Sequence, residues 1–301
     1  MIPFVREIHF EYGRCDQVSP LIRRVIADNP GPFTYVGTGT YIVGRGTVAV
    51  IDPGPDLPAH LQALLAALDG ETVSHILVTH HHSDHSPLAR PLQAATGARI
   101  FGRRAPHLAE PAPGLAPGPT MEAGEDDGFR PDVEIADDDV FEGPGWTLRA
   151  VATPGHTSNH VAFALAEENA LFSGDHVMGW STTVITPPDG DMGDYFASLE
   201  KVAAQGFQTL WPTHGAPVRD VAPFVQAYAD HRRAREAQVL AALEGGPTTI
   251  KAMVPTLYAA VDPRLHPAAA MSVLAHMLLL VKEGRVTCEG VAGLDSLYRL
   301  A

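Results

Sequence analysis

The stretch Val73-Ser-His-Ile-Leu-Val-Thr-His-His-His-Ser-Asp-His-Ser86 runs from an apolar segment directly into a polar cluster. Residues 73–78 are apolar and rich in branched side chains, which predicts a short buried strand. The cluster that follows has the pattern His80-x-His82-x-Asp84-His85, so four possible metal ligands lie within six residues. A surface turn has no packing reason to hold three histidines and an aspartate. Metal binding is therefore the economical interpretation of this stretch.

The spacing within the cluster favours two cations rather than one. The alternate positions of His80 and His82 let two imidazoles converge on one ion. Asp84 and His85 lie further round the turn and can face a second ion about 3.5–4 Å away, as in two-metal hydrolytic sites. Nitrogen and oxygen ligands without a thiolate suit zinc, with iron or manganese as alternatives. The expected cofactors are thus two divalent metal ions.

Two ions need more ligands than this turn supplies, and three further residues offer them. They are His156 in Thr-Pro-Gly-His-Thr, Asp175 in Ser-Gly-Asp-His and His214 in Pro-Thr-His-Gly, each at the end of a predicted strand. Each has a glycine beside it, which lets a loop backbone approach closely or take a positive φ, as converging ligands require. Together and in this order, they indicate the remaining ligands.

The flanking sequence predicts an α/β domain around the cluster. Residues 34–52 predict two strands with a turn at Gly44 to Gly46, and residues 57–68 have leucines at a helical period. With the strand at 73–78 they make a β-α-β unit, and the cluster lies at the carboxyl end of its second strand, where sites in α/β folds usually lie. The other expected elements are a short helix and strand at 87–101, strands at 146–153, 161–166, 170–172 and 209–212, and a helix at 194–205.

Two segments depart from this pattern. Residues 103–144 begin rich in Pro, Ala and Gly, and residues 122–142 hold ten acids against one base, which predicts a solvated surface insertion. Residues 219–301 show three helical stretches followed by a β-ribbon signal, which is the layout of a winged helix. We therefore expect a catalytic domain over residues 1–218 and a winged-helix domain over residues 219–301.

Charge is unevenly divided between these two parts. The whole chain carries −14, with 35 acids against 21 bases. Residues 219–301 hold nine bases and eight acids, so residues 1–218 hold twelve bases and twenty-seven acids, a charge of −15. This balance disfavours nucleic acid and anionic membranes as partners, because phosphates attract Lys and Arg. We expect a small-molecule substrate and a winged helix that walls the catalytic cleft, and the oligomeric state stays open.

Cysteine usage and the N-terminus further bound the class of protein. The two cysteines, Cys15 and Cys288, are far apart in the sequence and in no ligand spacing, which excludes a disulfide framework and a cysteine-based zinc finger. The N-terminal residues lack a long apolar core with a cleavage site, and no run of about eighteen uncharged apolar residues occurs. These features predict a cytoplasmic protein without a membrane segment.

The pattern His80-x-His82-x-Asp84-His85, followed by His156, Asp175 and His214, resembles the ligand set of the metallo-β-lactamase fold superfamily of hydrolases. The resemblance runs from about residue 34 to about residue 215 and implies an αββα sandwich. It further implies that Asp175 bridges the ions. It places three ligands on each metal: His80, His82 and His156 on the first, and Asp84, His85 and His214 on the second.

Two other residues match positions of that superfamily. Asp52, in Val-Ile-Asp-Pro-Gly, matches the strand-end aspartate that supports the ligand histidines through hydrogen bonds. Tyr195 matches a tyrosine at the start of a helix that lies near the pocket in related hydrolases, so it is a candidate for substrate binding. A packing role for Tyr195 is equally open.

Within the superfamily, the Asn29-Pro-Gly-Pro opening, the Ser-Gly-Asp segment and the helical C-terminus resemble the β-lactamase-like hydrolases that carry a C-terminal winged helix. That group is similar to glyoxalase II thioesterases in its core, and it includes a mitochondrial endoribonuclease and fungal polyketide thioesterases. The resemblance implies a metal-dependent hydrolase in which a hydroxide held by two metals attacks a carbonyl, with a thioester or related ester as the leading substrate. Asp84 is the expected catalytic residue, because its carboxylate can accept the proton of the water.

Three alternatives stay open. A metal-dependent endoribonuclease could use Arg232, Arg233 and Arg235 as a basic stripe, although three arginines on one helix also suit a solvated face. A persulfide dioxygenase with a single iron would leave His85 and His214 unused. A non-catalytic binding module would leave the whole ligand set without a function.

Overall fold

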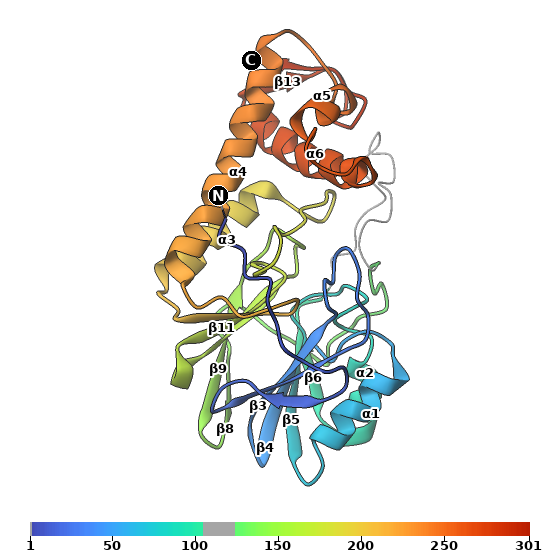
Figure 1. Ribbon diagram of the computed structural model, residues 1–301, viewed down its shortest axis with the longest axis vertical. Coiled ribbons are helices and arrows are strands. Elements are labelled where there is room, and N and C mark those ends of the chain that lie inside the picture. Colours follow the sequence, from blue (N-terminus) through green and yellow to red (C-terminus); the bar gives the residue numbers. More distant parts are fainter. Residues whose placement is uncertain (1, 105–123) are drawn as a thin grey trace.

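Two β-sheets lie face to face in the computed structural model, which describes residues 2–104 and 124–301 (Figure 1). The first sheet has seven strands in the order β1-β2-β3-β4-β5-β6-β7. They are β1 Cys15–Gln17, β2 Ile22–Ile26, β3 Gly39–Arg45, β4 Thr47–Ile51, β5 Thr72–Leu77, β6 Arg99–Gly102 and β7 Val133–Glu134. The second sheet has five strands in the order β12-β11-β10-β9-β8. They are β8 Val140–Gly143, β9 Trp146–Ala152, β10 Val161–Leu165, β11 Ala170–Gly174 and β12 Thr209–Pro212.

Three apolar clusters hold the layers together. Between the sheets, large side chains such as Tyr41, Phe172 and Trp211 pack against one another. On the outer face of the first sheet lie α1 (Pro58–Ala67) and α2 (Ala89–Thr96), which bury Leu64 and Leu92 against strand residues. On the outer face of the second sheet lie α3 (Met192–Ala204) and the first half of α4 (Val221–Glu244). The order helix, sheet, sheet, helix confirms the predicted αββα sandwich.

Parallel strand pairs bring the carboxyl ends of four strands to one edge of the sandwich. β4 and β5 are parallel and joined by α1, as the predicted β-α-β unit requires, and β11 and β12 are parallel in the other sheet. Gly46, with a φ of +71°, makes the tight turn from β3 into β4. Residues 80–85 follow β5, Asp175 follows β11 and His214 follows β12. The fold therefore delivers these side chains to the same end of the molecule.

The prediction of a surface insertion over residues 103–144 is wrong for residues 124–144, while residues 105–123 lie outside the described residues. β7 pairs with β6 and β8 pairs with β9, so this segment completes both sheets. Phe129, Ile135 and Phe141 are buried in the apolar clusters. These three residues are spaced six apart among carboxylates, most of which face solvent, and the acidic composition obscured the inward-facing pattern.

The C-terminal part has a small core of its own. It is built from α5 (Ile250–Leu257), α6 (His266–Lys282), the end of α4, and the paired strands β13 (Val286–Cys288) and β14 (Tyr298–Leu300). This arrangement confirms the predicted winged helix. Within the described ranges, one helical segment, Pro263–Lys282, is long and apolar enough to cross a membrane. It comprises a 3-10 turn and α6, and α6 buries Met271, Leu274 and Met277 in this core.

The long helix α4 joins the two cores (Figure 1). Phe224, Val225 and Tyr228 in its first half pack with α3 against the second sheet. Val239 and Leu243 near its end belong to the C-terminal core instead. The predicted division at residue 219 thus falls just before a helix that both parts share, and as a domain boundary it stays a prediction.

Candidate metal centre

The structure brings together all seven residues that the sequence assigned to metals. Each is buried, with a relative exposure between 0% and 8%. Four of them come from the turn after β5 in the first sheet. The other three come from the second sheet, at the β9–β10 connection and after β11 and β12. The seven residues are His80, His82, Asp84, His85, His156, Asp175 and His214.

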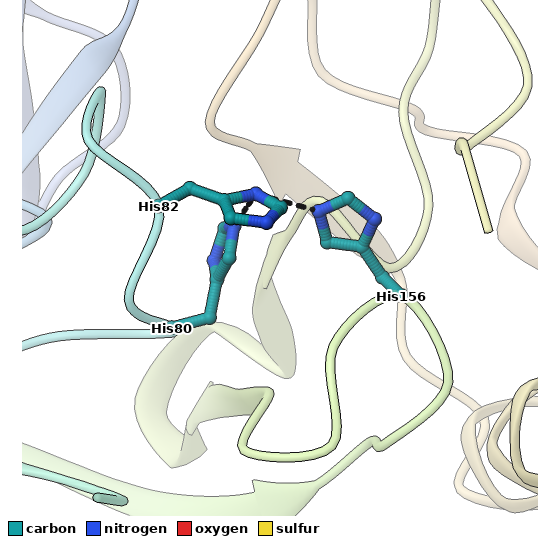
Figure 2. Close-up of side chains that lie close together, drawn as sticks. All are labelled: His80, His82 and His156. Carbon is teal, nitrogen blue, oxygen red and sulfur yellow. Dashed lines mark hydrogen bonds between the residues drawn. The ribbon is translucent and has the colours of Figure 1, made fainter. Parts of the chain in front are cut away.

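Three imidazoles form the first group of ligand atoms (Figure 2). Nε2 of His80 lies 2.9 Å from Nδ1 of His82, and Nε2 of His156 lies 3.2 Å from the same Nδ1. Nitrogens that bind a tetrahedral zinc ion at about 2.0–2.1 Å are themselves about 3.3 Å apart. The three nitrogens are therefore spaced much as the ligands of one ion would be.

Asp84, His85 and His214 form the second group. Oδ2 of Asp84 lies 3.1 Å from Nε2 of His214 and 3.6 Å from Nε2 of His85. The ligand atoms of these three residues all lie within 4.8 Å of one another. One carboxylate oxygen and two imidazole nitrogens thus face a common point.

Asp175 lies between the two groups. Its Oδ1 is 3.6 Å from Nε2 of His85 and 3.5 Å from Nε2 of His214, on the side of the second group. Its Oδ2 is 3.9 Å from Nε2 of His156, on the side of the first group. The two oxygens of one carboxylate therefore face different groups, which is the position of a bridging ligand.

The hydrogen bonding of these atoms indicates that a ligand belongs among them. Nε2 of His85 and Oδ1 of Asp175 are buried, and neither has a hydrogen-bond partner among the described residues. Unpartnered buried polar atoms are rare in folded proteins and need a physical reason. The donor set of imidazole nitrogens and carboxylate oxygens suits a divalent cation such as zinc. The residues present therefore fit the metals that the sequence implied.

Asp52 supports the centre from the end of β4. Its Oδ2 accepts hydrogen bonds from Thr79 Oγ1 at 2.8 Å, from His85 Nδ1 at 2.9 Å and from Thr213 Oγ1 at 3.0 Å. Its Oδ1 accepts from the backbone N–H of Thr79 at 2.8 Å. A proton held on Nδ1 of His85 leaves the lone pair of Nε2 directed at Asp84 and Asp175. The structure thus places Asp52 where the sequence predicted it.

Main-chain carbonyls orient two further imidazoles in the same way. Nδ1 of His156 donates to the carbonyl oxygen of Val184 at 2.7 Å, and Nδ1 of His214 donates to that of Gly37 at 3.2 Å. Each bond selects the tautomer whose Nε2 can bind a cation. The sequence analysis missed both acceptors, because any residue type can supply a carbonyl oxygen.

Charges within the centre favour particular protonation states. Burial alone would raise the pKa of Asp84, but the imidazoles of His85 and His214 lower this pKa to about 2. Burial would lower the pKa of His214, but Asp175 and Asp84 raise it to about 10. The pKa of Asp175 is likewise lowered and that of His85 likewise raised, despite burial, by their charged neighbours. Both carboxylates are therefore ionised, and without a cation His85 and His214 carry protons, so a cation that binds at their Nε2 atoms displaces those protons.

His160 is a supporting residue that the sequence analysis missed. Its Nε2 accepts the backbone N–H of Asp175 at 3.2 Å, and its Nδ1 lies 2.8 Å from Thr153 Oγ1. Burial and the neighbouring histidines hold its pKa well below the usual value, so the ring is neutral and Nε2 can accept. Gly174 makes this contact possible, since a Cβ there would lie 2.5 Å from Nε2 of His160. The only sequence signal is a histidine at the start of an apolar strand.

A cavity opens onto the centre. Four ligand residues, His82, Asp84, Asp175 and His214, line it. The lining residue Trp180 stacks its ring on that of Tyr35, with centroids 4.8 Å apart and planes 11° apart, which restrains the Trp180 side chain. A bound molecule would thus meet both ligand residues and apolar side chains. The remaining lining residues are Pro32, Phe33, Met178, Trp180, Ser181, Thr182 and Val184.

Tyr195 lies near the centre without facing the cavity. The side chain is fully buried, and its hydroxyl donates to the carbonyl oxygen of His176 at 2.8 Å. It packs beneath Gly155, where a Cβ would come within 2.4 Å of Cα of Tyr195. Of the two roles left open for Tyr195, these contacts correspond to packing. A substrate contact stays a prediction.

Two family models match the sequence. The model of the metallo-beta-lactamase superfamily matches residues 34–214, and that of the beta-lactamase associated winged helix domain matches residues 249–292. The helix α4 lies between the two matched ranges.

Curated proteins and solved structures agree with these matches. The chain is 30% identical to the lactamase-like protein adaB of Aspergillus niger, over 96% of this chain and 92% of that protein. It is 34% identical to an atrochrysone carboxyl ACP thioesterase of Claviceps purpurea, over 76% of this chain and 67% of that protein. A metallo-beta-lactamase family protein of Thermus thermophilus matches the structure with a TM-score of 0.76 at 25% identity, over 95% of this chain and 100% of that chain.

Proposed function

Since this chain is a hydrolase of the metallo-beta-lactamase superfamily, with the associated winged helix domain in its C-terminal part, we propose that it hydrolyses a thioester at a centre of two divalent cations. Zinc is the expected metal, with iron or manganese as alternatives. The reaction adds water across the C–S bond and yields a carboxylic acid and a thiol. The expected substrate is a small acyl thioester.

One observation carries the two-cation part of this proposal. Asp175 directs one oxygen at His156 of the first group and the other at His85 and His214 of the second group. A persulfide dioxygenase with a single iron would leave His85 and His214 buried beside Asp84 and Asp175 without a function. The paired arrangement therefore favours hydrolysis.

The cavity and the relatives support an acyl substrate. Met178, Trp180 and Val184 line the same cavity as the ligand residues and can take up an apolar acyl group while its carbonyl reaches the ligands. One relative at 34% identity bears the name of a thioesterase. A thioester joins an acyl group of this kind to a good leaving group.

Asp84 is the residue that we assign to proton transfer. Divalent cations, when bound, lower the pKa of a coordinated water and polarise a carbonyl group. Asp84 lines the cavity, and its ionised carboxylate lies 3.1 Å from His214, which fixes its orientation. It accepts the proton that the water loses on attacking the carbonyl carbon. The same carboxyl group returns the proton to the sulfur as the C–S bond breaks.

The arginines of α4 give little support to the ribonuclease alternative. Arg232 is 4% exposed, and Arg235 lies 4.0 Å from the ring centroid of Tyr258. Arg233 lies 3.4 Å from a carboxylate oxygen of Glu200. A nucleic-acid module needs clustered cations that are free to meet phosphates. These side chains face different neighbours, so a carbonyl substrate is the better proposal.

A substrate panel tests the proposal. The protein is stripped with a chelator, reloaded with Zn²⁺, and assayed on an acyl thioester, a lactone, a β-lactam and a short RNA, with bound metal counted in parallel. We expect the thioester to be cleaved fastest, with about two ions per chain. The variant Asp175→Asn is the control for metal-dependent turnover. Faster RNA cleavage, or thioester cleavage that survives stripping, would refute the proposal.

A further inference from the structure

Residues 175–185, here called the wall loop, contribute both a ligand and part of the cavity lining to the candidate centre. The loop begins with the ligand Asp175, and it supplies Met178, Trp180 and Val184 to the cavity. Its Val184 carbonyl also accepts the hydrogen bond that orients His156. The conformation of this loop therefore sets both the ligand geometry and the shape of the cavity.

Tyr228, on the first half of α4, holds the middle of the wall loop. Its side chain is fully buried. The hydroxyl accepts the backbone N–H of Met178 at 3.2 Å, and it lies within donating distance of the carbonyl oxygens of Met178 (2.5 Å) and Ser181. One hydroxyl thus bonds the main chain on both sides of Trp180.

Arg232, one turn further along α4, holds the end of the loop. Its Nη2 donates to the carbonyl oxygen of Thr183, and its Nη1 lies 3.3 Å from Ser272 Oγ on α6. The guanidinium carbon lies 5.4 Å from the ring centroid of Tyr195. The carbonyl that accepts from Arg232 is next in sequence to the one that accepts from His156.

Burying the charged guanidinium of Arg232 costs free energy, which indicates a role other than stabilising the fold. The residue is 4% exposed, and in the part of the chain that the structure describes no carboxylate pairs with it and its Nε has no hydrogen-bond partner. A buried charge without an opposite charge destabilises a protein, so stability alone does not account for it. Within the described residues, its hydrogen bond to the main chain goes to the wall loop at Thr183.

Thr183 connects the end of the wall loop, which Arg232 holds, to Asp175 at the start of the loop. Its hydroxyl lies 2.8 Å from the carbonyl oxygen of Asp175 and 2.9 Å from that of His176. Fixing the Thr183 backbone therefore restrains the backbone of Asp175 as well as the Val184 carbonyl. Neither family match covers α4, so nothing in those matches assigns this role to the helix.

We infer that Arg232 and Tyr228 are positioning residues of the metal centre: through the wall loop, α4 orients His156 and Asp175 and holds the cavity wall. This inference rests on the proposed metal centre but not on the identity of the substrate. Groups that orient metal ligands typically change metal affinity by roughly 10- to 100-fold when they are removed. Metal affinity is therefore the readout that separates positioning from mere packing.

The first experiment compares metal retention. Protein reloaded with Co²⁺ is titrated with a competing chelator, and the midpoint of cobalt loss is measured for wild type, Arg232→Met, Arg232→Lys and Arg233→Met. We expect Arg232→Met to lower the apparent affinity roughly 10- to 100-fold. Arg232→Lys keeps one donor for Thr183 and should recover part of this loss. Arg233→Met removes a charge from the next position of the same helix and should match wild type.

The second experiment uses Tyr228→Phe, which keeps the ring and removes only the hydroxyl. We expect KM for an acyl thioester to rise several-fold with a smaller change in kcat, because the wall that holds the acyl group loosens. If Arg232→Met fails to fold, Arg232→Lys and Tyr228→Phe decide the question. Lower melting temperatures with unchanged cobalt midpoints and KM would overturn the inference. A wild-type protein that binds no cobalt would instead refute the metal centre itself.

Discussion

Asp175 differs from the other ligands because each of its oxygens faces a different group. The variant Asp175→Ala removes both oxygens and should lose both cations. His214→Ala removes a ligand of the second group alone and should retain the ion held by the three imidazoles. Metal per chain, measured by mass spectrometry after dialysis, tests this difference. Loss of a single ion in both variants would exclude a bridging role for Asp175.

The two roles proposed for Asp84, metal ligand and proton acceptor, can be separated by one substitution. Asp84→Asn keeps an oxygen that can bind a cation but removes the charge and the proton acceptor. Turnover of the thioester should fall by at least about 10²-fold, the lower range for acid–base groups, while metal content falls less. Steady-state kcat and metal content are measured on the same preparation. Turnover close to that of wild type would mean that another group accepts the proton.

The candidate ligands could be predicted from the sequence because their chemistry is specific to their side chains. Three histidines and an aspartate directly after an apolar strand serve no packing purpose, which leaves metal binding as their evident role. The supporting contacts could not be predicted in this way. Val184 and Gly37 act through carbonyl oxygens that every residue has, and His160 acts through burial that only the assembled sheet creates.

At the scale of elements, hydrophobic periodicity predicted most helices and strands. Amino-acid composition gave a wrong prediction where it conflicted with the pattern of apolar residues. The acidic residues around β7 and β8 suggested a solvated loop, although Ile135 and Phe141 face the core. For α4, the sequence predicted a helix but not its two sets of neighbours. A helix with apolar residues on changing faces reveals its partners only when the sheets and α6 are in place.

Helix α6 buries a histidine among cations. His276 is fully buried, and neither of its ring nitrogens has a hydrogen-bond partner within residues 2–104 and 124–301. Burial, together with the charges of Arg232 and Arg235, lowers its pKa to about 3. The usual value, about 6.5, applies in the unfolded chain. Between these values the unfolded chain takes up a proton at His276 and the folded chain does not. The contribution of neutral His276 to the free energy of unfolding is therefore complete above about pH 6.5 and is lost as the pH falls towards 3.

This difference predicts a measurable pH dependence. Between about pH 7.5 and about pH 5, the free energy of unfolding should fall by about 2 kcal/mol more in wild type than in His276→Met. Urea denaturation at the two pH values, with equal metal content, measures it. The control is His9→Asn, at a side chain that is 90% exposed, which should follow wild type. Identical pH dependence in His276→Met and wild type would contradict the assignment.

At the scale of the whole molecule, the shared helix predicts that two truncations behave differently. A chain that ends at residue 218 loses Phe224, Val225 and Tyr228, which uncovers α3 and the second sheet. We expect it to be poorly soluble and inactive. A chain that ends at residue 247 keeps α4 and uncovers mainly Val239 and Leu243, so it should retain some thioester turnover. Equal soluble yield and turnover of the two chains would contradict this view of α4.

The origin of the ligands has a mechanical consequence. His80, His82, Asp84 and His85 belong to the first sheet, and His156, Asp175 and His214 to the second. A cation bound by residues of both sets would cross-link the two sheets at one edge of the sandwich. Chelation should therefore lower the melting temperature, with recovery on adding Zn²⁺, and should speed amide exchange first at this edge. An unchanged melting curve would show that the layers hold without it. A lowered melting temperature would mean that metal loss weakens the contact between the two sheets as well as the proposed reaction.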